Sequence, residues 1–160
     1  MRFHLVTNSD LELRDINNKN LFLGSWCVPY KEKISTEGMN YNYVIPNFID
    51  KKTLDKNHKK VIKYSEILFT EVSKILNNHH NEKFNNRQWL IMIGSFIHQY
   101  VSLMINRYDN LDRAIKNYDI SSSTFYPDNY DISCKNNTNF LKICDENLWN
   151  NVLYHKLLNY

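Results

Sequence analysis

Glycine, proline and cysteine are all scarce in this sequence, with three of each among 160 residues. The low glycine and proline counts exclude collagen-like and linker-like chains. Three glycines cannot form a glycine-rich loop around a phosphate group, and no P-loop, G-x-G-x-x-G, G-x-S-x-G or H-E-x-x-H motif occurs. The three cysteines lack C-x-x-C spacing, which fits a reducing compartment better than a disulfide framework.

The composition is otherwise that of an ordinary globular domain. Hydrophobic residues make up 42% and charged residues 23% of the chain, so the sequence predicts one folded domain over residues 1–160. The formal net charge of +3 does not require a nucleic-acid partner, and none is predicted. The sequence contains 24 asparagines, which we interpret as codon bias accumulating on tolerant surface positions.

Short strands are predicted in the first part of the chain. Residues 3–7 are rich in β-formers, residues 21–24 end at the glycine of a turn, and residues 41–45 alternate weakly before Pro46. The polar segment 8–20 predicts a loop. Another short strand is predicted at residues 124–126, after a turn-like run of serines.

Two long helices and a last, shorter one follow from the apolar spacing. Asp50 is expected to cap a helix that reaches about Asn77, and a second helix should run over residues 86–116. The last helix is expected to begin at Asp145 and to end at Leu158, with an apolar face that needs a surface to dock on.

The second long helix has an uncharged centre of 19 residues, 88–106, between Arg87 and Arg107. We expect a buried core helix, because polar residues such as His98 interrupt the run; a helix that spans or touches a membrane is the alternative. The first helix carries a lysine-rich face, which we interpret as solvated rather than as a membrane or nucleic-acid patch; its members are Lys51, Lys52, Lys56, Lys59, Lys60 and Lys63.

Five residues are candidates for lining a cleft. His4 lies in the first predicted strand, and Trp26 and Cys27 follow the second, beyond whose carboxyl end ligands bind in open α/β sheets. Arg87 opens the second long helix and could hold a phosphate or carboxylate, and His98 lies in its middle. Structural roles remain open for each, among them core packing for Trp26, a helix-end ion pair for Arg87 and a hydrogen-bonded core histidine for His98. Catalytic residues are not identified, and no metal site is predicted.

The chain resembles the N-terminal region of a transferase family associated with bacterial O-antigen and surface-polysaccharide clusters. The resemblance rests mainly on two islands, Phe-Leu-Gly-x-Trp-Cys at residues 22–27 and Arg-x-Trp-x-x-x-x-Gly at residues 87–94. The opening residues 2–7, the continuation to residue 108 and the segment 147–150 are also similar to that region.

This resemblance implies the Rossmann-like N-terminal half of a GT-B-like glycosyltransferase, an α/β fold with few short parallel strands, two long helices and a C-terminal helix. The complete enzyme would move a sugar from a nucleotide-sugar donor to a surface-glycan acceptor, without a bound metal. This chain would be its acceptor-side part and inactive alone, with no cofactor of its own. A C-terminal donor-binding domain or a partner chain would dock on the last helix. We expect a cytoplasmic location, and a position at the inner face of the membrane is the alternative within that compartment.

Two non-enzymatic functions remain as alternatives. The two long helices could pack as an interaction module whose terminal helix docks on a partner. The lysine-rich face and the uncharged helix could instead hold the chain at an anionic membrane surface, as a peripheral membrane protein.

Overall fold

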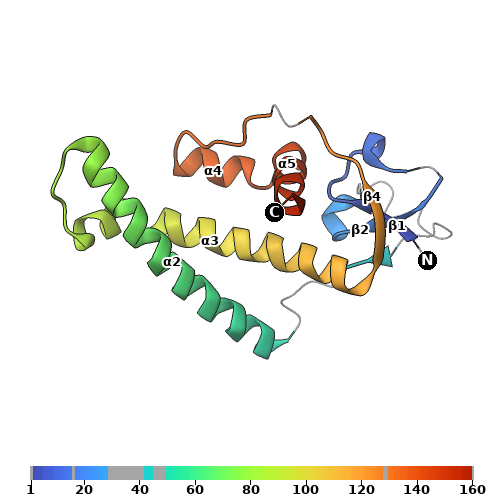
Figure 1. Ribbon diagram of the computed structural model, residues 1–160, viewed down its shortest axis with the longest axis horizontal. Helices are drawn as coiled ribbons and strands as arrows, with labels where there is room; N and C mark the ends of the chain where they lie inside the picture. The colour runs from blue at the N-terminus through green and yellow to red at the C-terminus, as the bar shows by residue number, and fades with distance from the viewer. Residues whose placement is uncertain (1, 16, 29–41, 45–49, 128–129, 160) are drawn as a thin grey trace. The chain divides into compact units, whose positions relative to one another are not determined.

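The computed structural model describes residues 2–15, 17–28, 42–44, 50–127 and 130–159. Two compact units make up the chain: unit 1 comprises residues 1–46 and 108–160, and unit 2 comprises residues 47–107. The long helix α3 contributes to both units (Figure 1).

Unit 1 contains a parallel sheet of four strands in the order β3-β2-β1-β4. The strands are β1 (Arg2–Val6), β2 (Lys19–Phe22), β3 (Asn42–Tyr43) and β4 (Asp119–Ser123). Single-turn 3-10 helices follow the first two strands, η1 (Leu11–Leu13) and η2 (Ser25–Cys27). The α/β class with few short parallel strands is therefore confirmed.

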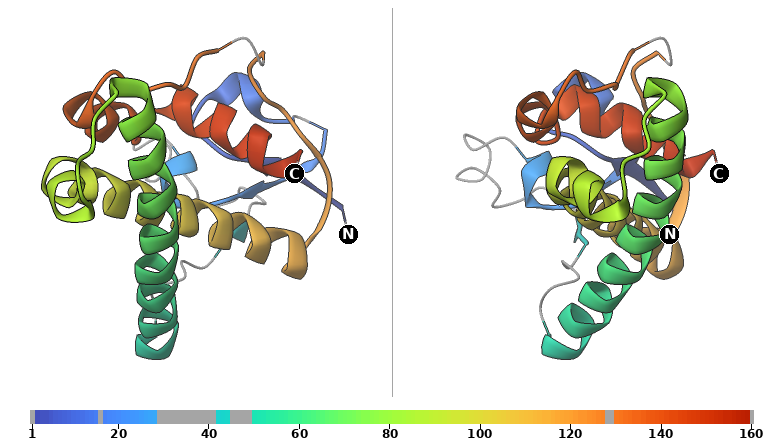
Figure 2. Two further views of the ribbon diagram at one scale, coloured as in Figure 1. Left: turned by 60° about the vertical axis from the view of Figure 1, so that its left-hand side comes forward. Right: turned by 90° about the vertical axis from the view of Figure 1, so that its left-hand side faces the viewer.

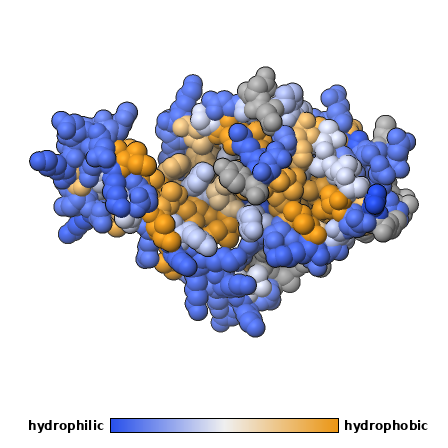
Figure 3. Space-filling view, in the orientation of Figure 1, coloured by the Kyte–Doolittle hydropathy of each residue, from blue (hydrophilic) through white to orange (hydrophobic). Residues whose placement is uncertain are grey.

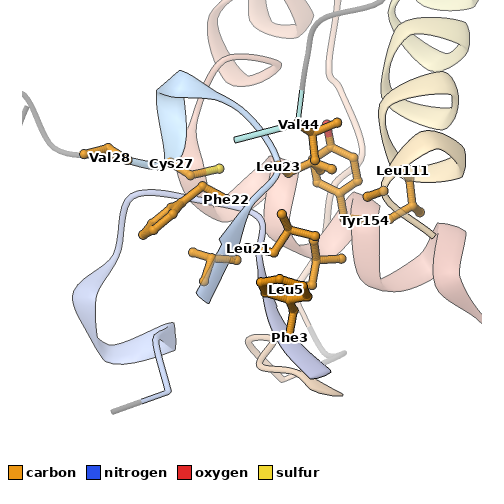
Figure 4. Close-up of a cluster of buried hydrophobic side chains, with 12 residues drawn as sticks. Phe3, Leu5, Leu21, Phe22, Leu23, Cys27, Val28, Val44, Leu111 and Tyr154 are labelled. Atoms are coloured by element: carbon orange, nitrogen blue, oxygen red, sulfur yellow. The ribbon is translucent and has the colours of Figure 1, made fainter. Parts of the chain in front are cut away.

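The central strands are buried on both faces, as expected of a parallel sheet. Phe3, Leu5 and Leu21 pack with Leu111 from the end of α3 and with Tyr154 from the last helix (Figure 4). The same cluster includes Leu23 and Val28, which lie before and after the η2 turn. Burial of these side chains supplies the main favourable term for folding of unit 1.

Strand β4 lies just before its predicted position, within the serine run that the sequence suggested was a turn. The Ser121 hydroxyl donates to the Phe3 carbonyl oxygen at 3.2 Å, and the Ser123 hydroxyl donates to that of Leu5 at 2.7 Å. The register shifts between Phe3 and His4, so that Ser122 lies opposite His4. Pairing with β1 outweighs the turn preference of serine, and the bulge sets the direction of Ser122.

Unit 2 consists of the helix α2 (Lys51–His80) and most of the helix α3 (Asn86–Asn117). A short turn joins the two helices, which cross one another (Figure 2). Asp50 caps α2 as predicted, by accepting from the Thr53 amide at 2.8 Å. Asn81, with φ of 53°, ends it in the left-handed region.

The turn of unit 2 is held by one asparagine. Asn77 Oδ1 accepts from the Phe84 amide at 3.1 Å and from Trp89 Nε1 at 2.9 Å, while Asn77 Nδ2 donates to the Phe84 carbonyl at 2.9 Å. Gly94, one turn further along α3, leaves room for Leu90, which a Cβ there would meet at 2.7 Å. Within the second sequence island, Trp89 therefore helps to hold this turn, and Gly94 accommodates the Leu90 side chain on the same helix.

The apolar centre of α3 is mostly exposed, so the prediction of a buried core helix is wrong for this structure. Only 17% of its most apolar 18-residue window is buried, and Ile91 is 79% exposed. The reason is that the described part of unit 2 consists of two helices, which cover one side of each other. By length and composition, α3 is the one helix in the described part of the chain that could cross a membrane.

Two helices follow β4, namely α4 (Asn137–Ile143) and α5 (Asn147–Leu158). The sequence analysis missed α4, which Asn136 caps by accepting from the Asn139 amide at 2.8 Å. The cap of α5 is Glu146 rather than Asp145, so this helix begins slightly later than predicted. Its apolar residues Trp149, Val152 and Leu153 are buried, so this chain already covers most of that face.

Candidate functional site

The strand order places a candidate site at the carboxyl ends of β1 and β4. Strands β2 and β3 are added to one side of β1, whereas β4 is added to its other side. The direction in which the chain adds strands to the sheet therefore reverses between β1 and β4. In open parallel sheets, ligands bind outside the carboxyl ends of the strands at such a point. Here residues 7–10 and 124–126 leave the two strands side by side.

Asn151 of α5 ties the two segments together. Its Nδ2 donates to Thr7 Oγ1 at 3.0 Å and to the Thr124 carbonyl at 3.4 Å, and its Oδ1 accepts from the Tyr126 amide at 2.9 Å. Thr7 and Asn151 are 2% and 0% exposed, respectively. One turn earlier, Asn147 Nδ2 donates to Ser9 Oγ at 2.6 Å. The first turn of α5 is therefore fixed over the carboxyl end of β1.

Asp10 and Tyr126 meet across this site. The Tyr126 hydroxyl donates to Asp10 Oδ2, and Asp10 Oδ1 accepts from the Glu12 amide at 3.1 Å. Asn8, which is fully buried, accepts from the Asp10 amide at 2.9 Å through Oδ1. Its Nδ2 is also buried, and the Asn8 side chain forms a hydrogen bond with Tyr126 that favours the charged phenolate.

The electrostatic field at this pair is negative. The hydrogen bond from Tyr126, followed by that from the Glu12 amide, lowers the pKa of Asp10 from its usual value of 3.8. Burial, together with the hydrogen bond to Asp10 and the nearby charges of Asp10 and Glu12, raises the pKa of Tyr126 to about 12. A smaller opposing effect comes from the Asn8 side chain, which faces the phenol oxygen. The site thus holds an ionised carboxylate beside a neutral phenol.

His4, the first of the predicted cleft residues, is buried beneath this site. Its Nδ1 lies 2.9 Å from Ser122 Oγ, and its Nε2 lies 3.0 Å from the Leu13 carbonyl oxygen and 3.4 Å from Thr124 Oγ1. Because a carbonyl only accepts, Nε2 carries a proton and donates to Leu13. His4 therefore links both site-forming strands to the β1–β2 connection.

Trp26 and Cys27 lie in η2, beyond the end of β2. Trp26 is 38% exposed, so it does not close the core, and its ring lies where a Cβ on Gly24 would be, at 2.0 Å. This close approach requires glycine at position 24. Cys27 is fully buried among apolar side chains and is a core residue, not a lining one.

Arg87 and His98 belong to unit 2, on α3. Both side chains are exposed. His98 lines a small cavity of about 150 Å³ within unit 2, together with Glu66, Phe69, Leu90 and Gly94 among others. Of the five predicted residues, His4 supports the β1/β4 end and Trp26 and Cys27 lie after β2, all in unit 1, whereas Arg87 and His98 lie in unit 2.

The residues that make up the β1/β4 site were missed by sequence analysis. Asn8 and Asp10 fall in the segment predicted as a polar loop, and Asn151 belongs to the asparagines interpreted as surface bias. In fact Asn8, Asn110, Asn150 and Asn151 are all buried. The available signal was a run of polar residues directly after a buried strand, and residues 7–10 form such a run.

The cysteines and histidines offer little further chemistry. Cys27, Cys134 and Cys144 form no disulfide. Within the described ranges, no three His, Cys, Asp or Glu side chains are grouped closely enough to hold a metal ion.

Residues 3–160 match the family model described as the LIC12162 family transferase. No curated protein and no solved structure matches the chain.

Proposed function

Because this chain belongs to the LIC12162 transferase family, we propose that it serves a glycosyltransferase that moves a sugar from a nucleotide-sugar donor to a surface-glycan acceptor. The observation that carries this proposal is the polar end of the parallel sheet between β1 and β4. It combines carboxylate, amide and hydroxyl groups, which are the groups that bind the hydroxyls of a sugar.

In this proposal the chain forms the acceptor side of a GT-B-like enzyme. The oxygen of the acceptor hydroxyl forms a bond to the anomeric carbon of the donor and gives its proton to a base of the complete enzyme, while the bond to the diphosphate breaks and the diphosphate leaves with the electron pair. Positive groups and helix N-termini stabilise such a leaving group. We assign those groups to a separate donor-binding domain or partner chain, and therefore expect no transfer by the chain alone.

The proposed partner has limited surface to use on α5. The buried Trp149 and Val152 are not accessible to it, whereas Lys156 and Leu158 near the end of this helix are exposed. We propose that the donor-binding part docks at this exposed end. A cytoplasmic location, at the inner face of the membrane when glycan is transferred, follows from the nature of the nucleotide-sugar donor.

Deletion of the gene in the organism that encodes the chain tests this function. We expect a shortened or missing surface polysaccharide on gel electrophoresis, with one sugar lost from its composition. Reintroduction of the intact gene should restore both. An unchanged polysaccharide in the deletion strain would contradict the proposal.

A second candidate function is peripheral membrane binding through unit 2. Leu90, Ile91 and Met92 of α3 are exposed, and apolar side chains reach the surface in Figure 3. The beginning of α2 carries the lysine-rich face, which is hydrophilic at the bottom of the same view. Sedimentation with vesicles that contain anionic lipid, lost at high salt, would support this function. Absence of sedimentation at low salt would contradict it.

A further inference from the structure

We propose that a stripe of four lysines on α2 binds an acidic glycan chain, so that the acceptor of the proposed transferase is a negatively charged polysaccharide. The four residues, which we call the lysine stripe, are Lys52, Lys56, Lys59 and Lys63. This inference rests on the proposed function for the identity of the chain as the acceptor. It goes further by naming the chemical class of that acceptor and the helix face of unit 2 that holds it.

The spacing of these lysines places them in one line. They follow one another at intervals of four, three and four residues, so at 3.6 residues per turn they fall within an arc of about 60° on the helix. From the first lysine to the last, the stripe extends along the helix axis for about 16 Å. All four side chains are exposed. Among the described residues, the walls of an open depression of about 810 Å³ come from the stripe and from Lys51, Asp55 and Lys60.

Positive charge is concentrated around the stripe. Residues 51–63 contain six lysines and one aspartate, which gives a net charge of +5, whereas the whole chain carries +3, so the remaining residues sum to −2. No ion pair joins a stripe lysine to a carboxylate among the described residues, although Lys74 and Lys116 form such pairs elsewhere, at 2.8 and 2.7 Å. An anionic partner is therefore drawn to this face in preference to the rest of the chain.

The apolar side of α2 is already covered within unit 2. Val61, Leu68 and Val72 lie on the side of the helix away from the stripe, and they pack with Ile97 and Val101 of α3. A helix that lies on a membrane inserts its apolar face between the lipid headgroups. Since that face of α2 packs on α3, the stripe offers contacts of charge alone, which suit a hydrated polymer.

The residue types on this face favour a glycan over nucleic acid. No Phe, Tyr or Trp occurs in residues 51–63, whereas single-stranded nucleic acids bind to aromatic stacking platforms. The helix also contains no arginine, which is the residue type that holds phosphates through two parallel hydrogen bonds. Lysine ammonium groups are flexible point charges that adapt to negative charges recurring along a polymer. Several such contacts along one chain raise its affinity together.

Titration of the full chain with sugars of different charge tests the inference. The probes are an oligomer of galacturonic acid, monomeric galacturonate and neutral dextran, each measured by isothermal titration calorimetry at low salt. We expect the oligomer to bind, its affinity to fall as salt is added, and dextran not to bind. The monomer should bind on the order of a hundredfold more weakly, because it meets one lysine at a time. Absence of binding by the oligomer, or equal binding of dextran, would overturn the inference.

Two variants with the same change in net charge separate the stripe from the charge of the whole chain. The stripe variant combines Lys52→Gln, Lys56→Gln, Lys59→Gln and Lys63→Gln. It should bind the oligomer on the order of a hundredfold more weakly, because each exposed ion pair contributes up to about fivefold. The control variant changes four exposed lysines elsewhere and should lose no more than a few-fold; it combines Lys74→Gln, Lys83→Gln, Lys135→Gln and Lys142→Gln. Equal losses in the two variants would contradict the inference.

The folding of both variants is checked by circular dichroism. Glutamine has nearly the helix propensity of lysine, so both spectra should match that of the parent chain. The weaker binding of the stripe variant then reports the lost charges.

A second titration separates the glycan from a membrane surface. Vesicles that contain phosphatidylglycerol are measured under the same conditions as the oligomer. Because the apolar side of α2 is not free to insert, we expect the vesicles to bind more weakly than the oligomer. Tighter binding of the vesicles would assign the stripe to an anionic membrane and would overturn the inference.

Failure of this inference is distinguishable from failure of the proposed function. The polysaccharide lost on gene deletion should contain acidic groups, and the stripe variant should restore it less well than the control variant does. If the lost glycan has no acidic groups, or if the stripe variant restores it fully, the stripe is wrongly assigned and the transferase function stands. If gene deletion leaves the glycan unchanged, the function itself is wrong.

Discussion

The two units of this chain achieve their stability differently. Unit 1 contains a cluster of 12 buried apolar residues around a parallel sheet, and polar side chains are buried at one end of that sheet. In unit 2 the corresponding cluster has three buried residues, Val61, Ile97 and Val101, and the remaining apolar contacts are only partly buried. Two crossed helices cannot enclose a core, so the hydrogen bonds at their turn contribute a larger share of the stability of unit 2.

The difference indicates where function resides. Unit 1 tolerates buried polar groups such as Asn8 and Asn151, because the surrounding apolar core holds them in fixed positions. Unit 2 instead exposes apolar surface, which is typical of a region that contacts another surface. We therefore assign ligand chemistry to unit 1 and association to unit 2.

The comparison is tested most strongly by equivalent truncations in the two units. Leu21→Ala in β2 should lower the free energy of unfolding by about 3–4 kcal/mol, because the side chain is fully buried. Ile91→Ala in α3 should change it by no more than about 0.5 kcal/mol, since that side chain is 79% exposed. Urea denaturation measures both values. Equal losses would mean that Ile91 is covered in solution.

The next largest effect concerns Asn151. Asn151→Ala removes the partners of Thr7, of the Tyr126 amide and of the Thr124 carbonyl, and should cost about 2–3 kcal/mol of unfolding free energy. Asn147→Ala, one turn away on the exposed side, loses a single bond to Ser9 and should cost under about 0.5 kcal/mol. Thermal denaturation of both variants provides the comparison; similar losses would show that the buried network is not what fixes α5.

A smaller, local effect is expected in unit 2. Asn77→Ala leaves Trp89 Nε1 and the Phe84 amide without their acceptor, and should lower the free energy of local opening by about 1–2 kcal/mol. Hydrogen exchange should show this loss in α2 and the start of α3 but not in β1 or β2. The exposed neighbour Asn78 supplies the control variant, Asn78→Ala. Faster exchange throughout the chain would mean that the two units open together.

The last expected effect is a pH dependence that distinguishes the site in unit 1. The pKa of Tyr126 is raised from its usual value of 10 to about 12, so the folded state keeps a proton that the unfolded state loses. The free energy of unfolding should therefore fall as the pH rises from 10 to about 12. This fall should be smaller in Tyr126→Phe. Denaturation curves across this range measure it, and identical curves for the two proteins would contradict the Asp10–Tyr126 contact.

Much of the fold could be predicted from the sequence. The cap at Asp50, the two long helices and the first two strands follow from apolar spacing and capping residues, and the structure confirms them within a few residues. Strand β4 was misplaced because serine favours turns locally, whereas its pairing with β1, distant in sequence, decides the outcome. The short helix α4 was missed because its seven residues carry little periodicity.

The candidate site was predicted only in part. His4 was selected for its place in the first strand, and it does lie beneath the site. Asn8, Asp10 and Tyr126 were not selected, because their roles depend on two distant segments of the chain lying side by side. Asp10 and Tyr126, which are in contact, are 116 positions apart in the sequence. An asparagine count cannot show which asparagines are buried. The strand order determines which asparagines become buried, and the sequence alone leaves that order open.

The most direct test of the central claim, that the β1/β4 end of unit 1 serves glycan transfer, is restoration of the deletion strain by single-residue alleles. We expect the Asp15→Asn allele to restore the surface polysaccharide fully. The Asp10→Asn allele should fail to restore it, although immunoblots show equal amounts of both proteins. Full restoration by Asp10→Asn would contradict the account, because the carboxylate proposed to hold the acceptor would then be dispensable.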